Sequence, residues 1–205
     1  MRTGVSNSLT GSEVANGEYT LYVGGDEHKP WKAYCHGGDE FLSVNDYTNF
    51  GGCGAGGWTQ GTDVRTTYTK LRIDPATLTI DITDQTFAST EGDLNFLGEH
   101  ITSMPLGIAM ACAGSASYGT GNIDLTGTPF RIATSFVLGS SDVVVAGAPQ
   151  APVIPTGGSF DSREGQWLEM WVHGECGFVG PAGVTAPTKL ANGYVLKVEW
   201  FVPTT

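Results

Sequence analysis

The chain runs Thr66-Thr67-Tyr68-Thr69-Lys70-Leu71-Arg72-Ile73-Asp74-Pro75-Ala76-Thr77-Leu78-Thr79-Ile80-Asp81-Ile82-Thr83-Asp84-Gln85-Thr86-Phe87-Ala88-Ser89-Thr90 in the stretch that decides its fold. Apolar residues alternate with polar ones on both sides of Asp74-Pro75-Ala76-Thr77, and a period of two is typical of a half-buried strand. Proline presets φ for the second position of a type I turn, and the aspartate before it can hold the turn's backbone N–H groups. The stretch therefore predicts a β-hairpin with Leu71, Ile73, Leu78, Ile80 and Ile82 on the core side.

Composition extends this prediction to the whole chain. The 205 residues include 30 glycines and 10 prolines, both of which disfavour helix interiors. No segment repeats apolar residues at the spacing of an amphipathic helix over ten or more residues. We expect a mostly β fold with little helix: a single domain of antiparallel sheets with long Gly-rich loops over residues 16–205. Residues 1–15 are expected to be an N-terminal arm or linker.

Other segments alternate as strands or contain residues that break strands. The first three strands are predicted to form a meander, and the last two are needed to close the sheet; the five are Glu18–Val23, Trp31–Cys35, Phe41–Val44, Gln166–Val172 and Tyr194–Phe201. Residues 45–65 are rich in glycine and predict a loop, and 146–158 predict a surface loop. The apolar run 106–113 fits either a buried strand or one helical turn.

The charge balance limits the classes of partner. Ten Lys and Arg residues against 21 Asp and Glu residues give a formal net charge of −11. This charge repels phosphate backbones, anionic lipid and sulfated polysaccharide, so nucleic acid is not expected as a partner. No apolar run approaches the roughly 20 residues that span a bilayer, so no membrane insertion is expected.

The best candidate for a metal site combines two loops of the predicted meander. Carboxylates and imidazoles would meet there if both loops lay at one end of the sheet, and they would hold a structural zinc or calcium ion. The residues are Asp26, Glu27, His28, His36, Asp39 and Glu40. The alternative is a solvated acidic loop end. A second, weaker cluster comprises Asp161, Glu164, His173 and Glu175.

Four cysteines, Cys35, Cys53, Cys112 and Cys176, form no C-x-x-C pair, so a four-thiolate zinc site is unsupported. An even number in a loop-rich chain favours two disulfides, and Cys35–Cys53 would fasten the glycine-rich loop. Cys112–Cys176 would be the second pair. Four buried free thiols are the alternative.

Catalytic motifs do not stand out in the sequence. No H-E-x-x-H, G-x-S-x-G, P-loop or dinucleotide fingerprint is present, and nothing selects one carboxylate pair for glycoside hydrolysis among 21 acids. Exposed tryptophans can form a platform for sugars. The five tryptophans fall mainly at strand positions, which favours core roles for them; they are Trp31, Trp58, Trp167, Trp171 and Trp200.

Several blocks in the same order resemble the GON domain, the module at the C-terminus of some ADAMTS-type secreted metalloproteases. The blocks are Gly17–Val23, Trp31–Cys35, Glu40–Val44, Asn49-Phe50 and the hairpin, and Asn122–Thr128 continues the similarity. The chain departs from the family at His173–Phe178, where animal members carry a cysteine cluster and this chain has Cys176 alone. The resemblance implies an extracellular or secreted module, without its own active site, that accompanies a zinc metalloprotease. The acidic chain with few cysteines looks like a bacterial relative.

The sequence therefore predicts a non-catalytic extracellular or surface interaction module with an unknown protein or glycan partner. One alternative is a self-assembling structural protein that packs through its N-terminal arm and sheet edges. The other is a metal-dependent or carbohydrate-active hydrolase.

Overall fold

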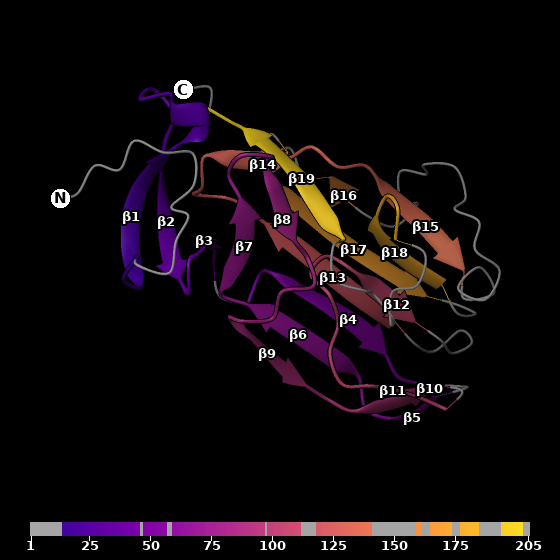
Figure 1. Ribbon diagram of the computed structural model, residues 1–205. Helices are drawn as coiled ribbons and strands as arrows, with labels where there is room; N and C mark the ends of the chain where they lie inside the picture. Colours follow the sequence, from indigo (N-terminus) through magenta and orange to yellow (C-terminus); the bar gives the residue numbers. More distant parts are fainter. Residues whose placement is uncertain are drawn as a thin grey trace.

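The computed structural model describes residues 14–45, 47–56, 59–96, 98–111, 118–140, 159–160, 165–173, 177–184 and 194–202. These residues are mostly β, as the sequence predicts, and a single 3-10 turn, η1 (Val23–Gly25), accompanies the strands (Figure 1). The strands are β1 (Gly17–Tyr22), β2 (Pro30–His36), β3 (Asp39–Ser43), β4 (Phe50–Gly54), β5 (Thr59–Gly61), β6 (Val64–Tyr68), β7 (Lys70–Asp74), β8 (Thr79–Asp81), β9 (Ala88–Glu91), β10 (Leu94–Phe96), β11 (Glu99–Ile101), β12 (Ala109–Ala111), β13 (Tyr118–Asp124), β14 (Phe130–Ile132), β15 (Phe136–Ser140), β16 (Ser159–Phe160), β17 (Trp167–His173), β18 (Gly177–Pro181) and β19 (Val195–Trp200).

The first large sheet contains the predicted meander and hairpin. Its seven strands follow the order β1-β2-β3-β7-β8-β19-β14, so the last predicted strand, β19, extends this sheet beside β8. The other strand predicted to close it, β17, belongs to the second large sheet instead. The hairpin β7–β8 pairs Ile73 with Ile80 and Asp74 with Thr79. The Asp74 carboxylate accepts the backbone N–H of Ala76 at 2.8 Å, which is the turn chemistry that the sequence indicates.

The second large sheet corrects the prediction for the glycine-rich stretch. Residues 50–54 are not a loop: they form β4 inside a nine-stranded sheet of order β15-β18-β12-β4-β13-β17-β16, with β6 added beside β4 and β9 beside β6. The glycines permit a close approach of backbones, because a Cβ atom on Gly52 would lie 2.6 Å from the Thr120 carbonyl oxygen. The apolar run after residue 105 supplies β12, which pairs with β4 in parallel, while the other pairs of this sheet are antiparallel.

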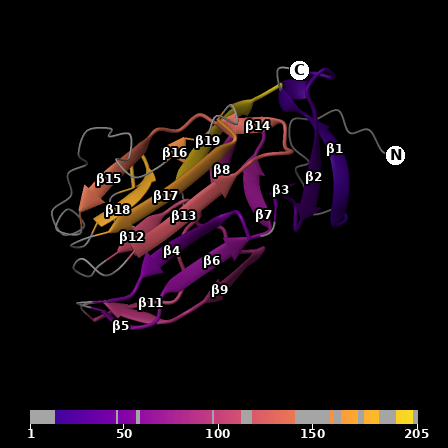
Figure 2. The ribbon, with the colours of Figure 1, turned by 180° about the vertical axis from the view of Figure 1, so that it is seen from behind.

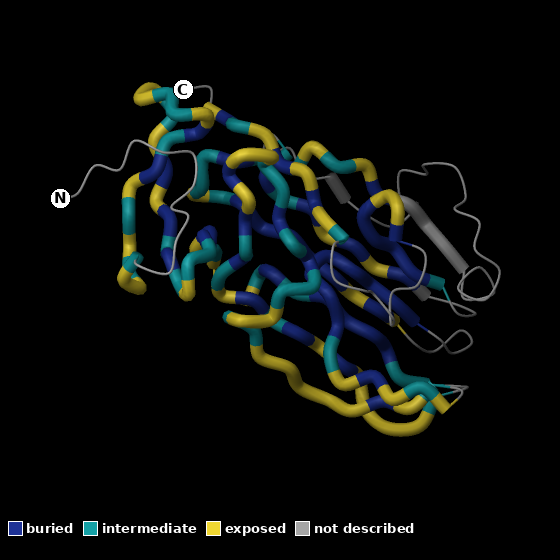
Figure 3. Tube along the Cα trace, in the orientation of Figure 1, coloured by how far each residue is buried: buried dark blue, intermediate teal, exposed yellow. Residues whose placement is uncertain are grey.

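A third, small sheet of β11, β10 and β5 lies at the end of the β6–β9 layer (Figures 1 and 2). One hydrophobic cluster includes buried residues of both large sheets, among them Leu71 and Ile80 from the first and Ile123 and Met170 from the second. Figure 3 shows the buried chain concentrated in the middle of the molecule and the exposed chain along β5 and β9. Within the described ranges, no helix is long and apolar enough to cross a membrane.

Candidate functional site

The predicted metal cluster is not assembled. Asp26, Glu27 and His28 lie in the β1–β2 connection, whereas His36 and Asp39 flank the β2–β3 turn. Consecutive turns of a meander lie at opposite ends of the sheet, and the seven-residue β2 separates these two by roughly 20 Å. The expectation that both loops share one end is therefore wrong. No group of three or more His, Cys, Asp or Glu residues is placed to hold a metal within the described residues.

Each half of that cluster has a local role instead. The Asp26 carboxylate accepts the backbone N–H of His28 at 3.0 Å and lies 3.4 Å from the Lys29 ammonium, and both contacts lower its pKa. Asp39 receives a 2.7 Å hydrogen bond from Arg72. The His36 ring lies 5.3 Å from the Phe87 ring, in an aromatic cluster with Tyr34 and Phe41. Glu40 is buried in β3.

The proposed Cys35–Cys53 disulfide is also absent. Both thiols are free and buried, because Cys35 belongs to β2 in the seven-stranded sheet and Cys53 to β4 in the nine-stranded sheet. Burial raises the pKa of the Cys35 thiol to about 11 and that of Cys53 to about 12. Cys112, Cys176, Asp161, Glu164, Glu175 and the 1–13 segment lie outside the described residues, as does the side chain of His173.

The tryptophans divide between core and surface. Trp31 is buried, and its ring meets Phe130 edge-on at a centroid distance of 5.5 Å. Trp171 in β17 is 41% exposed, contrary to the core role expected from its strand position. The strand pattern does not distinguish the two faces of a sheet, which is why it missed this difference. Trp58 lies outside the described residues.

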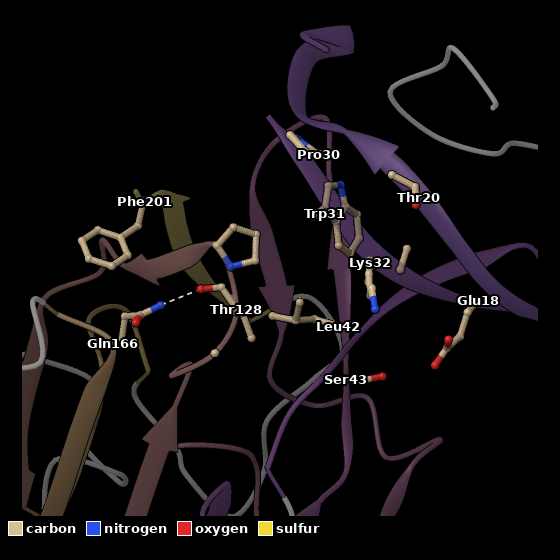
Figure 4. Close-up of a pocket in the computed structure, with 13 residues that line it drawn as sticks. Glu18, Thr20, Pro30, Trp31, Lys32, Leu42, Ser43, Thr128, Gln166 and Phe201 are labelled. Atoms are coloured by element: carbon tan, nitrogen blue, oxygen red, sulfur yellow. Dashed lines mark hydrogen bonds between the residues drawn. The ribbon is translucent and has the colours of Figure 1, made fainter. Parts of the chain in front are cut away.

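A cavity of about 730 Å³ lies beside the meander (Figure 4). The β2–β3 pairing runs only from His36–Asp39 to Tyr34–Phe41, and the cavity lies beyond it. Trp31, Lys32 and Ala33 of β2 line it together with Leu42 and Ser43 of β3. Its volume is within the range of about 300–1,000 Å³ that is typical of small-molecule sites.

One wall of the cavity is fixed by hydrogen bonds. The Gln166 side-chain nitrogen shares its two N–H groups among three carbonyl oxygens, those of Leu125 at 3.1 Å, Thr128 at 2.7 Å and Phe130 at 2.8 Å. The Thr128 hydroxyl donates to the Leu125 carbonyl at 2.8 Å, and the Pro129 carbonyl accepts the Phe201 N–H at 2.9 Å. We call this the Gln166 wall; it consists of residues 125–130 with Gln166 and Phe201. Its hydrogen bonds fix its groups before a ligand binds, so the wall is preorganised.

The opposite wall presents polar groups that are not engaged. Glu18, Thr20 and Lys32 come from the β1–β2 hairpin, where Thr20 pairs directly with Lys32 and Glu18 is the diagonal neighbour of Lys32 (Figure 4). All three residues and Ser43 are exposed, and all four are among the residues that line the cavity. Among the described residues, none of these four side chains has a hydrogen-bond or ion-pair partner. The lining of the cavity therefore includes one acid, one base and the hydroxyls of Thr20, Ser43 and Thr128, and the buried residues Trp31, Ala33 and Leu42 border it.

No family model, curated protein or solved structure matches this chain. The functional proposal therefore depends on the cavity. Sequence reasoning missed it because its lining residues come from positions 18 to 201, in six separate segments. Strand alternation places Glu18 and Lys32 of the cavity lining on a surface-facing side, and such positions are equally typical of a solvated strand face.

Proposed function

We propose that the chain is a non-catalytic interaction module of an extracellular or cell-surface protein, and that this cavity holds part of its partner. The observation that carries the proposal is the contrast between the two walls. The wall around Gln166 is locked by its own hydrogen bonds, while Glu18, Thr20, Lys32 and Ser43 have polar groups without partners among the described residues. A preorganised wall that faces solvent-exposed donors and acceptors supports a preformed binding site.

The resemblance to the GON domain also supports a non-catalytic interaction module. Two of the quoted blocks, Asn49-Phe50 and Asn122–Thr128, reach β4 and β13 of the nine-stranded sheet. The others fall on β1, β2, β3, β7 and β8, which are five neighbouring strands of the seven-stranded sheet. Three of those strands line the cavity. The resemblance implies a module that accompanies an enzyme without supplying its active site, and a recognition cavity is consistent with that role.

The test uses two matched substitutions on exposed strand serines. Ser43→Trp places an indole in the cavity, whereas Ser89→Trp places one on β9, which contributes nothing to the cavity lining. The probes are a printed array of neutral and sulfated glycans and a phage-displayed library of short peptides. The proposal predicts a probe that the native chain and Ser89→Trp bind and Ser43→Trp does not. Binding that survives Ser43→Trp, or an array and library without any bound probe, would contradict it.

Self-association is a second candidate, and the position of β1 favours it. β1 is the end strand of the seven-stranded sheet, and within the described residues it pairs only with β2. A free strand edge can accept a strand from a second copy. Light scattering at high concentration checks this candidate: a dimer dissociated by Thr20→Pro in β1 would support it, and a monodisperse monomer would exclude it.

A further inference from the structure

We propose that the ligand of the cavity is a neutral sugar residue, held by Glu18 and Lys32 through neighbouring hydroxyl groups. This inference rests on the proposed function, because it names the ligand class of the same site.

The charges of the cavity favour a neutral ligand. Its lining contains one carboxylate, Glu18, and one ammonium, Lys32, so the two formal charges cancel locally. Around it, the chain carries a net charge of −11, which disfavours sulfated or phosphorylated ligands. An anion would gain from Lys32 but would be repelled by Glu18 on the neighbouring strand.

The arrangement of hydrogen-bonding groups favours hydroxyls. Each sugar hydroxyl both donates and accepts, so one hydroxyl can donate to Glu18 while its neighbour accepts from Lys32. Register places Lys32 opposite Thr20 and diagonal to Glu18, which brings these donor and acceptor groups onto one face of the hairpin. Thr20 and Ser43 add two hydroxyls that are not bonded to other described residues. A peptide could instead pair with the edge of β2 at residues 30–33, which faces away from β1 and is not paired with β3, so a blocked tripeptide is the comparison probe for this alternative.

The apolar surface of the cavity complements the other side of a sugar ring. Pro129 of the Gln166 wall is partly exposed, whereas Trp31, Ala33 and Leu42 border the cavity but are buried. A pyranose has C–H groups on its faces and hydroxyls on its rim, so it can place the former on Pro129 and the latter toward Glu18 and Lys32. The pinned Gln166 wall limits the rearrangement that binding requires.

The experiment is a saturation-transfer and chemical-shift NMR titration of the full chain with neutral methyl glycosides of hexoses and N-acetylhexosamines. A 6-sulfated hexose and a blocked, uncharged tripeptide serve as comparison probes. We expect a neutral glycoside to bind, and Glu18→Gln and Lys32→Gln each to weaken it about tenfold, because each replaces a charge-assisted hydrogen bond with a weaker neutral one. Glu27→Gln, an exposed acid of the β1–β2 connection, is the matched control and should leave binding unchanged.

The outcomes separate this inference from the proposed function. Tripeptide binding that Ser43→Trp abolishes, without glycoside binding, would overturn the sugar inference and leave the cavity as a recognition site. Preference for the sulfated hexose would also overturn it, as would a glycoside affinity that neither Glu18→Gln nor Lys32→Gln reduces. If no probe binds at the cavity, both proposals fail.

Discussion

The carbonyl oxygen of Pro105 lies so close to Gly51 that a Cβ atom built on Gly51 would come within 1.9 Å of it. Gly119 is in the same position relative to Met110, where the corresponding distance is 1.8 Å. The backbone before and within β12 therefore packs directly on β4 and β13, and only glycine fits at these contacts.

Gly51→Ala should destabilise the fold severely, by more than about 3 kcal/mol, because the opposing atoms are backbone and cannot move aside alone. Gly24→Ala is the control, since Gly24 has φ of 62° but no atom within 4 Å of its Cβ position. That variant should lose only about 1–2 kcal/mol from the left-handed conformation. Urea unfolding measures both, and equal losses would contradict the packing argument.

Asp124 should make stability depend on pH in the acid range. Burial raises the pKa of this carboxyl, but hydrogen bonds from Thr126, Asn45 and Thr48 outweigh it and hold the pKa below its ordinary value. The ionised group therefore stabilises the fold above about pH 4, and this contribution is lost as the pH falls through the lowered pKa. Asp124→Asn should reduce stability by about 1–3 kcal/mol at pH 7 and by less at pH 3. Unfolding midpoints at the two pH values check this; a constant difference would contradict it.

The two buried thiols should be free and slow to react. In a Cys112→Ser/Cys176→Ser variant, we expect two thiols to titrate in denaturant and almost none in the native protein. The native reaction should remain slow even at pH 9, because burial raises the pKa of Cys35 to about 11 and of Cys53 to about 12, so that each thiol stays mostly protonated. If the two thiols can be titrated in denaturant only after reduction, a disulfide joins them and the prediction is wrong.

Gln166 should couple stability to binding. Gln166→Met keeps the side-chain size but leaves the carbonyls of Leu125, Thr128 and Phe130 without their amide donor. We expect a loss of about 1–3 kcal/mol in the free energy of unfolding and weaker ligand binding, because the wall is no longer preorganised. Calorimetric unfolding and NMR titration check the two effects. Unchanged binding in a destabilised variant would show that the wall's rigidity does not matter for recognition.

The sequence predicts the fold where its signals are local. Alternation and turn chemistry identified β1, β2, β3, β7, β8 and β19, since Asp74-Pro75 and the apolar period act over a few residues. The prediction of a loop was wrong at Gly51 and Gly52. Glycine propensity describes an isolated chain, whereas β4 is stabilised in part by strands more than 50 residues away. The same limit applies to the candidate site. Spacing suggested that Asp26 and Asp39 meet, but meander geometry separates them, and the cavity depends on contacts from β1 to Phe201 that no local pattern encodes.

The most direct test of the account maps ligand contacts by chemical shift in the labelled full chain, with the neutral methyl glycosides and the blocked tripeptide as probes. We predict that the backbone amides of Glu18, Thr20, Lys32, Ser43 and Thr128 shift together on addition of a neutral glycoside. Ser43→Trp should abolish these shifts, while Ser89→Trp should preserve them. Shifts confined to the exposed β13–β17 face around Tyr118 and Trp171, or no shifts with any probe, would contradict the claim that the cavity is the recognition site.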